Sequence, residues 1–143
     1  MTVSAILSKK GRDVATIDPK ADLMTAAKQM SERHIGALVV LGLDHRVAGI
    51  ISERDLVHAL AQRGAGALSE PVSKVMTRKV ATGVENETIP AIMERMTSGK
   101  FRHVPVIEQD RLVGIISIGD VVKHRIEEIE HETEALKDYI LTA

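Results

Sequence analysis

The sequence contains no cysteine and very few aromatic side chains, with Phe101 and Tyr139 as the only phenylalanine and tyrosine. Without cysteine the chain can form no disulfide framework, and it offers neither a thiolate metal ligand nor a cysteine nucleophile. Two aromatic rings are also too few for a platform on which the bases of single-stranded nucleic acid could stack. These absences exclude disulfide scaffolds, thiol enzymes and base-stacking modules.

The sequence also lacks an excess of charge and a long apolar run. Its 143 residues carry a formal net charge of −1 with acidic and basic side chains interspersed, so we expect no basic face for nucleic acid. No apolar stretch approaches the roughly 20 residues that span a bilayer, and residues 1–10 lack the apolar core of a signal peptide. We therefore expect a cytoplasmic protein with no nucleic-acid partner and no membrane partner.

One stretch of nine residues is present twice. The first copy begins at Gly49 and reads GIISERDLV, and the second begins at Gly114 and reads GIISIGDVV. In both copies an apolar, strand-like run ends at a serine, and an aspartate follows three residues later at the start of a helical pattern. A repeat of this length predicts two similar structural units that lie side by side.

Each half of the sequence predicts the same order of elements, namely helix, short strand, helix, strand, strand and helix. Asp22 and Thr88 are expected helix N-caps, because each precedes apolar residues that recur at spacings of three and four. The continuously apolar run 37–41 is typical of a buried strand, and its match is 104–107. The other expected elements are lead-in helices at 3–10 and 72–79, extended pieces at 14–17 and 80–82, strands at 46–51 and 111–116, and helices after Ser52 and Ser117.

The connections between these elements are short. Turns at 42–45 and 108–110 separate apolar runs and therefore predict two hairpins. Two glycines and a proline within residues 64–71 predict a linker between the halves. Because neither half could bury much apolar surface alone, we expect a mixed α/β (α+β) fold in which two small sheets pack together, flanked by helices, and share a core.

A long helix is expected at the C-terminal end, from about Ile118 to Tyr139. Part of it forms a heptad seam of about two repeats, which comprises Ile126, Ile129, Thr133, Leu136 and Ile140. The seam is too short for an independent coiled coil, so it either packs on its own chain or pairs with the same helix of a second chain. The predicted domains are residues 1–66, residues 67–125 and a helical extension at 126–143.

The repeated motifs resemble those of a cystathionine-beta-synthase (CBS) domain pair, also called a Bateman module. The resemblance rests on residues 35–40 and 49–55 in the first half and on 101–106 and 114–120 in the second. It implies two tandem CBS repeats with pseudo-twofold symmetry, standing alone and assembled as a homodimer. It also implies an adenosine-containing ligand in clefts between the repeats, with AMP expected first and ADP, ATP, NAD(H) and S-adenosylmethionine as alternatives.

The repeated Ser-x-x-Asp units are the expected ribose sites, because one carboxylate can accept hydrogen bonds from both ribose hydroxyls. The same pattern also caps a helix, and the two roles are compatible since a helix N-terminus favours a phosphate. The predicted first nucleotide site comprises Thr16, His34, Ile35, Gly36, Ala37, Ser52, Arg54 and Asp55. The predicted second site comprises Lys79, Thr82, Phe101, Arg102, His103, Val104, Pro105, Ser117, Gly119 and Asp120.

The two predicted sites differ in positive charge. Arg54 precedes Asp55 in the first copy of the motif, whereas Gly119 takes the corresponding place before Asp120 in the second. A phosphate in the second cleft would therefore depend on Arg102 and its histidine neighbour, or on Arg54 reaching across. We expect the two clefts to differ in ligand or in occupancy.

Neither metal binding nor catalysis is expected. His124 and His131 are not at the i, i+4 spacing of a helical metal pair, and the sequence has no His-Glu-x-x-His pattern. The serines of the repeated motif lack the glycine-flanked elbow of a nucleophile. Two functions stay open. One is a sensor whose repeats change their packing on binding an adenosine ligand and so regulate another protein, and the other is a ligand-free dimeric scaffold.

Overall fold

The structure is a computed structural model that describes residues 1–142 of the chain. The first half contains α1 (Val3–Lys10), β1 (Thr16–Ile17), α2 (Leu23–Arg33), β2 (Ala37–Leu41), β3 (Val47–Ser52) and α3 (Glu53–Arg63). The second half contains the 3₁₀ helix η1 (Gly64–Ser69), α4 (Val72–Val75), α5 (Ile89–Gly99), β4 (His103–Glu108), β5 (Arg111–Ser117) and α6 (Ile118–Thr142). The expected order of helices and hairpins is therefore confirmed.

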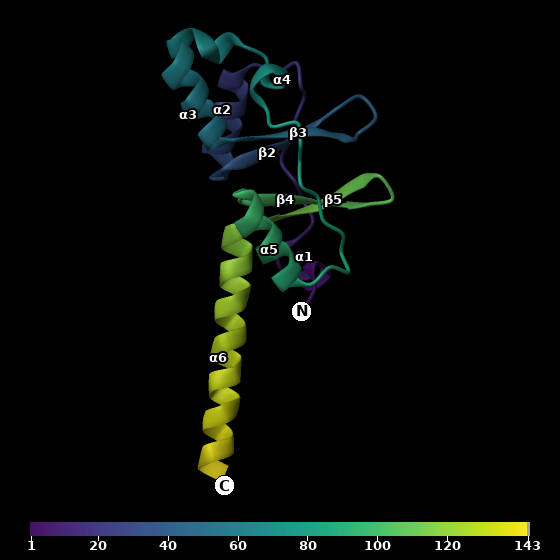
Figure 1. Ribbon diagram of the computed structural model, residues 1–143, viewed down its shortest axis with the longest axis vertical. Coiled ribbons are helices and arrows are strands. Elements are labelled where there is room, and N and C mark those ends of the chain that lie inside the picture. The colour runs from purple at the N-terminus through teal and green to yellow at the C-terminus, as the bar shows by residue number, and fades with distance from the viewer. Residues whose placement is uncertain (143) are drawn as a thin grey trace.

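Two small sheets lie next to each other in the middle of the molecule, with helices outside them (Figure 1). In the first sheet β1 runs parallel to β2 and β2 runs antiparallel to β3, and in the second β4 pairs antiparallel with β5. Helices α2, α3 and α4 cover the first sheet, while α1 and α5 cover the far side of the second. This arrangement confirms the mixed α/β fold of packed sheets flanked by helices.

The second sheet has one strand fewer than the repeat predicts. Residues 80–82 were expected to form a short strand, but only one isolated parallel bridge is present there, between Gly83 and Val106. The carbonyl of Thr82 instead accepts a hydrogen bond of 2.7 Å from Arg95 Nη1 on α5. Residues 80 and 81 lie free of the ladder and line the cavity described below.

The local predictions at helix starts and hairpin turns are confirmed. Asp22 accepts from the backbone N–H of Thr25 at 2.9 Å, and Thr88 accepts from the backbone N–H of Ala91 at 3.3 Å. The second hairpin turns tightly at Gln109 and Asp110, which both have positive φ, as the hairpin type that matches strand twist requires. These features depend on neighbouring residues, which is why the sequence alone predicts them.

Residues 64–71 are not the free linker that their glycines and proline suggest. Residues 64–69 form η1, and the side chain of Ala67 is buried in the core of the first repeat. The segment is also tied to α2 through a hydrogen bond of 3.0 Å from the backbone N–H of Leu23 to the carbonyl of Glu70. The small side chains of residues 64–69 therefore allow this segment to pack against the core of the first repeat.

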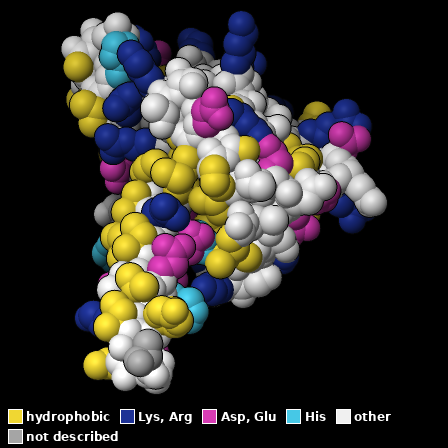
Figure 2. Space-filling view, turned by 60° about the horizontal axis from the view of Figure 1, so that its bottom comes forward, with side chains coloured by type: hydrophobic (Ala, Val, Ile, Leu, Met, Phe, Trp, Pro, Cys, Tyr) yellow, Lys and Arg dark blue, Asp and Glu magenta, His cyan; other side chains and the backbone are white. Residues whose placement is uncertain are grey.

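Helix α6 leaves the body of the molecule and projects as a stalk (Figure 1). It extends from Ile118 to Thr142, three residues beyond the predicted end, and only Val121 and His124 near its start are buried. The seam residues are all exposed along this stalk, with Leu136 60% and Ile140 65% accessible, so the seam does not pack on its own chain. Figure 2 shows hydrophobic side chains running along the stalk toward its tip.

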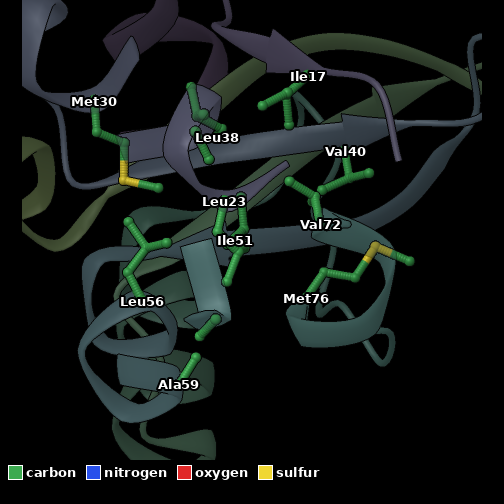
Figure 3. Packing of buried hydrophobic residues seen from close by; sticks show 12 residues of the cluster. Ile17, Leu23, Met30, Leu38, Val40, Ile51, Leu56, Ala59, Val72 and Met76 are labelled. Carbon is green, nitrogen blue, oxygen red and sulfur yellow. The ribbon is translucent and has the colours of Figure 1, made fainter. Parts of the chain in front are cut away.

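The core forms two clusters, one against each sheet, instead of the single shared core expected. Figure 3 shows the first cluster, in which Leu38 and Val40 of β2 point toward the helices that cover this sheet. Because alternate residues of a strand face opposite sides, Ala37 and Val39 face the other way, and both are buried outside the clusters. These two side chains are therefore buried on the face of β2 that points away from its covering helices, apart from both clusters.

The two lead-in segments are exchanged between the repeats. Val3, Ile6 and Leu7 of α1 belong to the cluster of the second repeat, although they stand at the start of the first. Val72 and Met76 belong to the cluster of the first repeat. The two halves of the sequence are therefore interlocked, and neither buries its own sheet without the other's lead-in helix.

Candidate functional site

The two Ser-x-x-Asp units form matching helix caps at the strand–helix junctions. In the first, the backbone N–H of Ser52 donates to Asp55 Oδ2 at 2.9 Å, and that of Asp55 donates to Ser52 Oγ at 3.3 Å. In the second, the corresponding bonds between Ser117 and Asp120 are 2.8 Å and 3.1 Å. The capping role is thus present in both copies, and each carboxylate is held at the start of a helix.

A cavity of about 570 Å³ opens beside Asp55, between the two repeats. We call it the Asp55 cavity. The first repeat contributes Gly36, Ile50, Ser52, Glu53, Arg54 and Asp55 to its lining. The second half contributes Thr77, Lys79, Val80, Ala81, Gly99, Lys100, Phe101, Arg102, His103, Ser117, Ile118 and Gly119. Its size lies in the range of small-molecule sites, which span about 300 to 1,000 Å³.

Positive charge predominates in the lining of the Asp55 cavity. Four basic side chains, those of Arg54, Lys79, Lys100 and Arg102, stand against the two acidic ones of Glu53 and Asp55. All four basic residues are exposed, and none of their side chains forms a hydrogen bond or ion pair with any residue in the range 1–142. The cavity can therefore receive an anion without breaking an existing ion pair.

The lining also provides apolar walls and a neutral histidine. Ile50, Val80 and Ile118 supply aliphatic surface, and Phe101 adds an aromatic ring. Burial lowers the pKa of His103 below its ordinary value of 6.5, although the nearby carboxylate of Asp120 acts in the opposite direction. The imidazole is therefore neutral at pH 7 for the most part, so it can donate or accept a hydrogen bond.

The Asp55 cavity combines residues from both predicted sites. It brings together Gly36, Ser52, Arg54 and Asp55 of the first predicted set with Lys79, Phe101, Arg102, His103, Ser117 and Gly119 of the second. Because the sequence groups residues by repeat, the prediction kept these two sets apart. The cavity lies between the repeats, and each repeat supplies one wall of it.

The other predicted residues lie outside this lining. Ala37 and Pro105 are buried in β2 and β4, Val104 belongs to the second core cluster, and Ile35 packs against the first. Thr16 pairs with Val39 in β1, Thr82 contacts Arg95 through its carbonyl, and His34 ends α2 in a left-handed conformation. Asp120 lies beside Lys10, as described next.

Asp120 is already paired, in contrast to Asp55. Lys10 Nζ lies 2.6 Å from Asp120 Oδ2 and donates a second hydrogen bond of 2.8 Å to the carbonyl of Ile115. Burial is the largest influence on the Asp120 carboxyl and raises its pKa, but the hydrogen bonds from Lys10 and Ser117 together hold that pKa below the ordinary 3.8. Asp120 is therefore ionised and neutralised by a lysine of the same chain.

The predicted sets do not include Lys10, and of the segment from Thr77 to Ala81 they include only Lys79. Thr77 and Ile50 exchange two backbone hydrogen bonds, of 2.9 and 3.0 Å, which place this segment beside β3 and the Asp55 cavity. Repetition of the lead-in segments 3–10 and 72–79 is the signal in the sequence that points to both regions. It does not indicate that each segment crosses to the other repeat.

Across residues 1–142, no group of three or more histidine, aspartate or glutamate side chains is arranged to hold a metal ion. In the same range, no helix combines the length and apolar character that crossing a bilayer requires.

Comparison with known proteins relates both halves of the chain to the same domain family. The sequence model of the CBS domain matches the chain twice, at residues 3–62 and 72–127. The chain is similar to the crystal structure of the CBS-domain containing protein ATU1752 from Agrobacterium tumefaciens. The two share 50% sequence identity and a TM-score of 0.84, over 87% of this chain and 92% of that one.

Two further similar structures contain ligands. The CBS domain protein PAE2072 from Pyrobaculum aerophilum is complexed with AMP, and it shares 26% identity and a TM-score of 0.75 over 84% of this chain and 89% of its own. The CBS domain pair of protein MJ0100 is in complex with 5′-methylthioadenosine and S-adenosyl-L-methionine, with 26% identity and a TM-score of 0.80 over 90% of this chain and 98% of its own. All three ligands contain adenosine.

Proposed function

Because this chain belongs to the CBS domain family, as two tandem CBS repeats, we propose that it is a regulatory protein that senses an adenosine nucleotide. The ligand binds in the Asp55 cavity, in contact with both repeats. The observation that carries this proposal is the placement of one capped carboxylate beside four unpaired basic side chains in a single cavity. A nucleotide needs both, because its ribose donates hydrogen bonds and its phosphate carries negative charge.

Asp55 is the ribose-binding residue in this proposal. Its Oδ2 atom accepts hydrogen bonds from the backbone and side chain of Ser52, whereas Oδ1 takes part in no hydrogen bond within residues 1–142. The capping contacts fix the carboxylate in place, and Oδ1 stays available to a ribose hydroxyl. A charged acceptor strengthens such a bond, which is worth about 1.5–3 kcal/mol.

The four unpaired basic side chains favour a ligand that carries phosphate. Arg54 and Arg102 present guanidinium groups that match the geometry of phosphate oxygens, and Lys79 and Lys100 add positive charge. S-adenosylmethionine has no phosphate and carries a positive sulfonium, so it gains less from this lining. AMP, ADP, ATP and NAD(H) are therefore the favoured ligands, with the adenine against the aliphatic wall formed by Ile50, Val80 and Ile118.

A thermal-shift screen tests this proposal. Ligand-free protein is melted alone and with AMP, ADP, ATP, NAD(H) or S-adenosylmethionine. A ligand at a hundred times its dissociation constant stabilises the folded chain by roughly 2.7 kcal/mol per site, which raises the melting temperature measurably. A flat response to all five ligands would favour the alternative function of a ligand-free scaffold.

Regulation requires a second surface, and the stalk of α6 provides one. Its exposed seam carries Ile126, Ile129, Leu136 and Ile140 along one face, and charged residues flank it. Two copies of the chain pair through this seam into a homodimer, since closed twofold pairing is a common way to cover such a stripe. Ligand binding shifts the packing of the repeats only by its difference in affinity for two states, and the regulated partner is another protein.

A further inference from the structure

The repeat gives this chain two equivalent carboxylates but not two equivalent clefts. Asp55 and Asp120 have the same cap geometry, and each holds a backbone N–H of its serine within 2.9 Å of Oδ2. The difference between them therefore lies in the surrounding side chains. Asp55 lines the open cavity, whereas Asp120 forms an ion pair with Lys10.

The position of Lys10 is fixed by the packing of α1. Lys10 is the last residue of α1, and the buried side chains of Val3, Ile6 and Leu7 anchor this helix in the core of the second repeat. Gly114 on β5 allows the close approach, because a Cβ at that position would lie 2.6 Å from Leu7 Cδ2. Lys10 therefore lies at the end of β5, where its Nζ donates hydrogen bonds to the carbonyl of Ile115 and to Oδ2 of Asp120.

The counterpart of Lys10 in the second half behaves differently. Lys79 ends the second lead-in segment, yet its side chain makes no hydrogen bond or ion pair with any residue described. The reason is that α4 ends at Val75, so the chain from Met76 to Ala81 runs along the cavity instead of continuing as a helix. One lead-in lysine therefore neutralises its aspartate, while the other is free to meet a ligand.

We infer that Lys10 determines which of the two repeated carboxylates binds nucleotide, because its ion pair neutralises Asp120 and leaves Asp55 as the binding carboxylate. This inference rests on the proposed function and adds its stoichiometry. The ammonium of Lys10, held 2.6 Å from Oδ2 and bonded to a backbone carbonyl, neutralises the charge that would make Asp120 a strong acceptor for ribose hydroxyls. The Asp120 motif also offers no arginine of its own, because Gly119 stands where Arg54 stands in the first copy. Each chain therefore takes one nucleotide, at Asp55.

Isothermal titration calorimetry with AMP tests the inference. The wild-type chain is expected to bind one AMP, the Asp55→Asn variant none, and the Asp120→Asn variant one with an affinity within about threefold of wild type. Two AMP per wild-type chain, or loss of binding in Asp120→Asn instead of Asp55→Asn, would overturn it. If neither AMP nor any other adenine nucleotide binds the wild type, it is the proposed function that fails.

A gain of binding tests the role of Lys10 itself. In the Asp55→Asn background, Lys10→Met is expected to restore AMP binding by freeing Asp120. The matched control is Lys9→Met in the same background, because Lys9 lies beside Lys10 on α1 and its one ion pair among residues 1–142 is with Glu127, at 3.7 Å. Restoration in both variants or in neither contradicts the inference.

Lys10 also ties the end of α1 to the carbonyl of Ile115, so each variant is first melted by circular dichroism to check that it folds. Lys10→Gln, which keeps a donor for the carbonyl of Ile115, replaces Lys10→Met if the latter unfolds. If both variants unfold, the stoichiometry and the two aspartate variants decide the inference without them.

Discussion

Substitution of Gly49 tests how the segment from Met76 to Ala81 is held beside the Asp55 cavity. A Cβ at this position of β3 would lie 2.7 Å from the carbonyl oxygen of Thr77 and 2.7 Å from Met76 Sδ. The Thr77 carbonyl cannot withdraw freely, because it accepts a hydrogen bond of 3.0 Å from the backbone N–H of Ile50. Gly49→Ala should therefore push the whole Met76–Ala81 segment outward.

The expected loss of stability follows from three contributions. Overpacking a core costs about 1–3 kcal/mol, and weakening the two hydrogen bonds between Ile50 and Thr77 costs about 1 kcal/mol each at most. Removing a strand glycine returns about 0.5–1 kcal/mol. The free energy of unfolding should therefore fall by about 2–3 kcal/mol, measured by urea denaturation. AMP binding should weaken as well, since the displaced segment lines the Asp55 cavity.

Gly114→Ala is the matched control, at the equivalent position of the second repeat. Its Cβ would meet the side chain of Leu7, at 2.6 Å from Cδ2, but no backbone atom lies among its nearest neighbours. A side chain can change its rotamer, so the loss should be smaller, about 1 kcal/mol, with AMP binding kept. A Gly49→Ala variant as stable as wild type, or a Gly114→Ala variant that is less stable than Gly49→Ala, would refute this reasoning.

Three further predictions follow from the aspartates and the stalk. Asp55→Ala should lower the affinity for AMP at least tenfold, since each hydrogen bond to a charged group is worth about 1.5–3 kcal/mol; unchanged affinity in calorimetry would leave Asp55 as a cap alone. Replacing both Ile129 and Leu136 with lysine should convert the proposed dimer to a monomer that still binds AMP, as measured by sedimentation, and a monomeric wild type or a dimeric variant would contradict the seam's proposed role. The folded-state pKa of Asp120 is lowered. The stabilisation that its ionised carboxylate gives the folded chain is therefore complete above the ordinary pKa of 3.8, and it is lost as pH falls through the lower folded-state pKa. Urea midpoints measured from pH 6 to pH 2 should show this loss, and Lys10→Met should reduce it; equal pH dependence in both proteins would argue against the ion pair.

The features predicted correctly from the sequence depend on short stretches of chain. Asp22, Thr88 and the two Ser-x-x-Asp units act within three residues of themselves, so the caps follow from local spacing. The hairpins and the long C-terminal helix follow from turn residues and from the periodicity of apolar side chains. The heptad spacing predicts the apolar stripe along α6, but only the structure shows that the body of the chain does not cover it.

The features missed from the sequence depend on contacts between distant segments. The exchange of α1 and α4 between the repeats leaves no local pattern, because Val3 and Val72 would look equally apolar in either core. The sequence predicts clefts between the repeats, but it does not show which residues of each half line the same cavity, as those around the Asp55 cavity do. Lys10 resembles any exposed helix-end lysine until the fold brings it to Asp120.

The central claim is that the Asp55 cavity binds an adenosine nucleotide, and equilibrium dialysis measures this most directly. Ligand-free wild-type protein is dialysed against AMP, ADP, ATP and NAD(H) in separate cells, with Asp55→Asn as the paired sample. The account predicts saturable retention of at least one of these nucleotides in the wild-type chamber and none with the variant. Equal concentrations of every nucleotide on both sides of the membrane, or equal retention by wild type and variant, would contradict it.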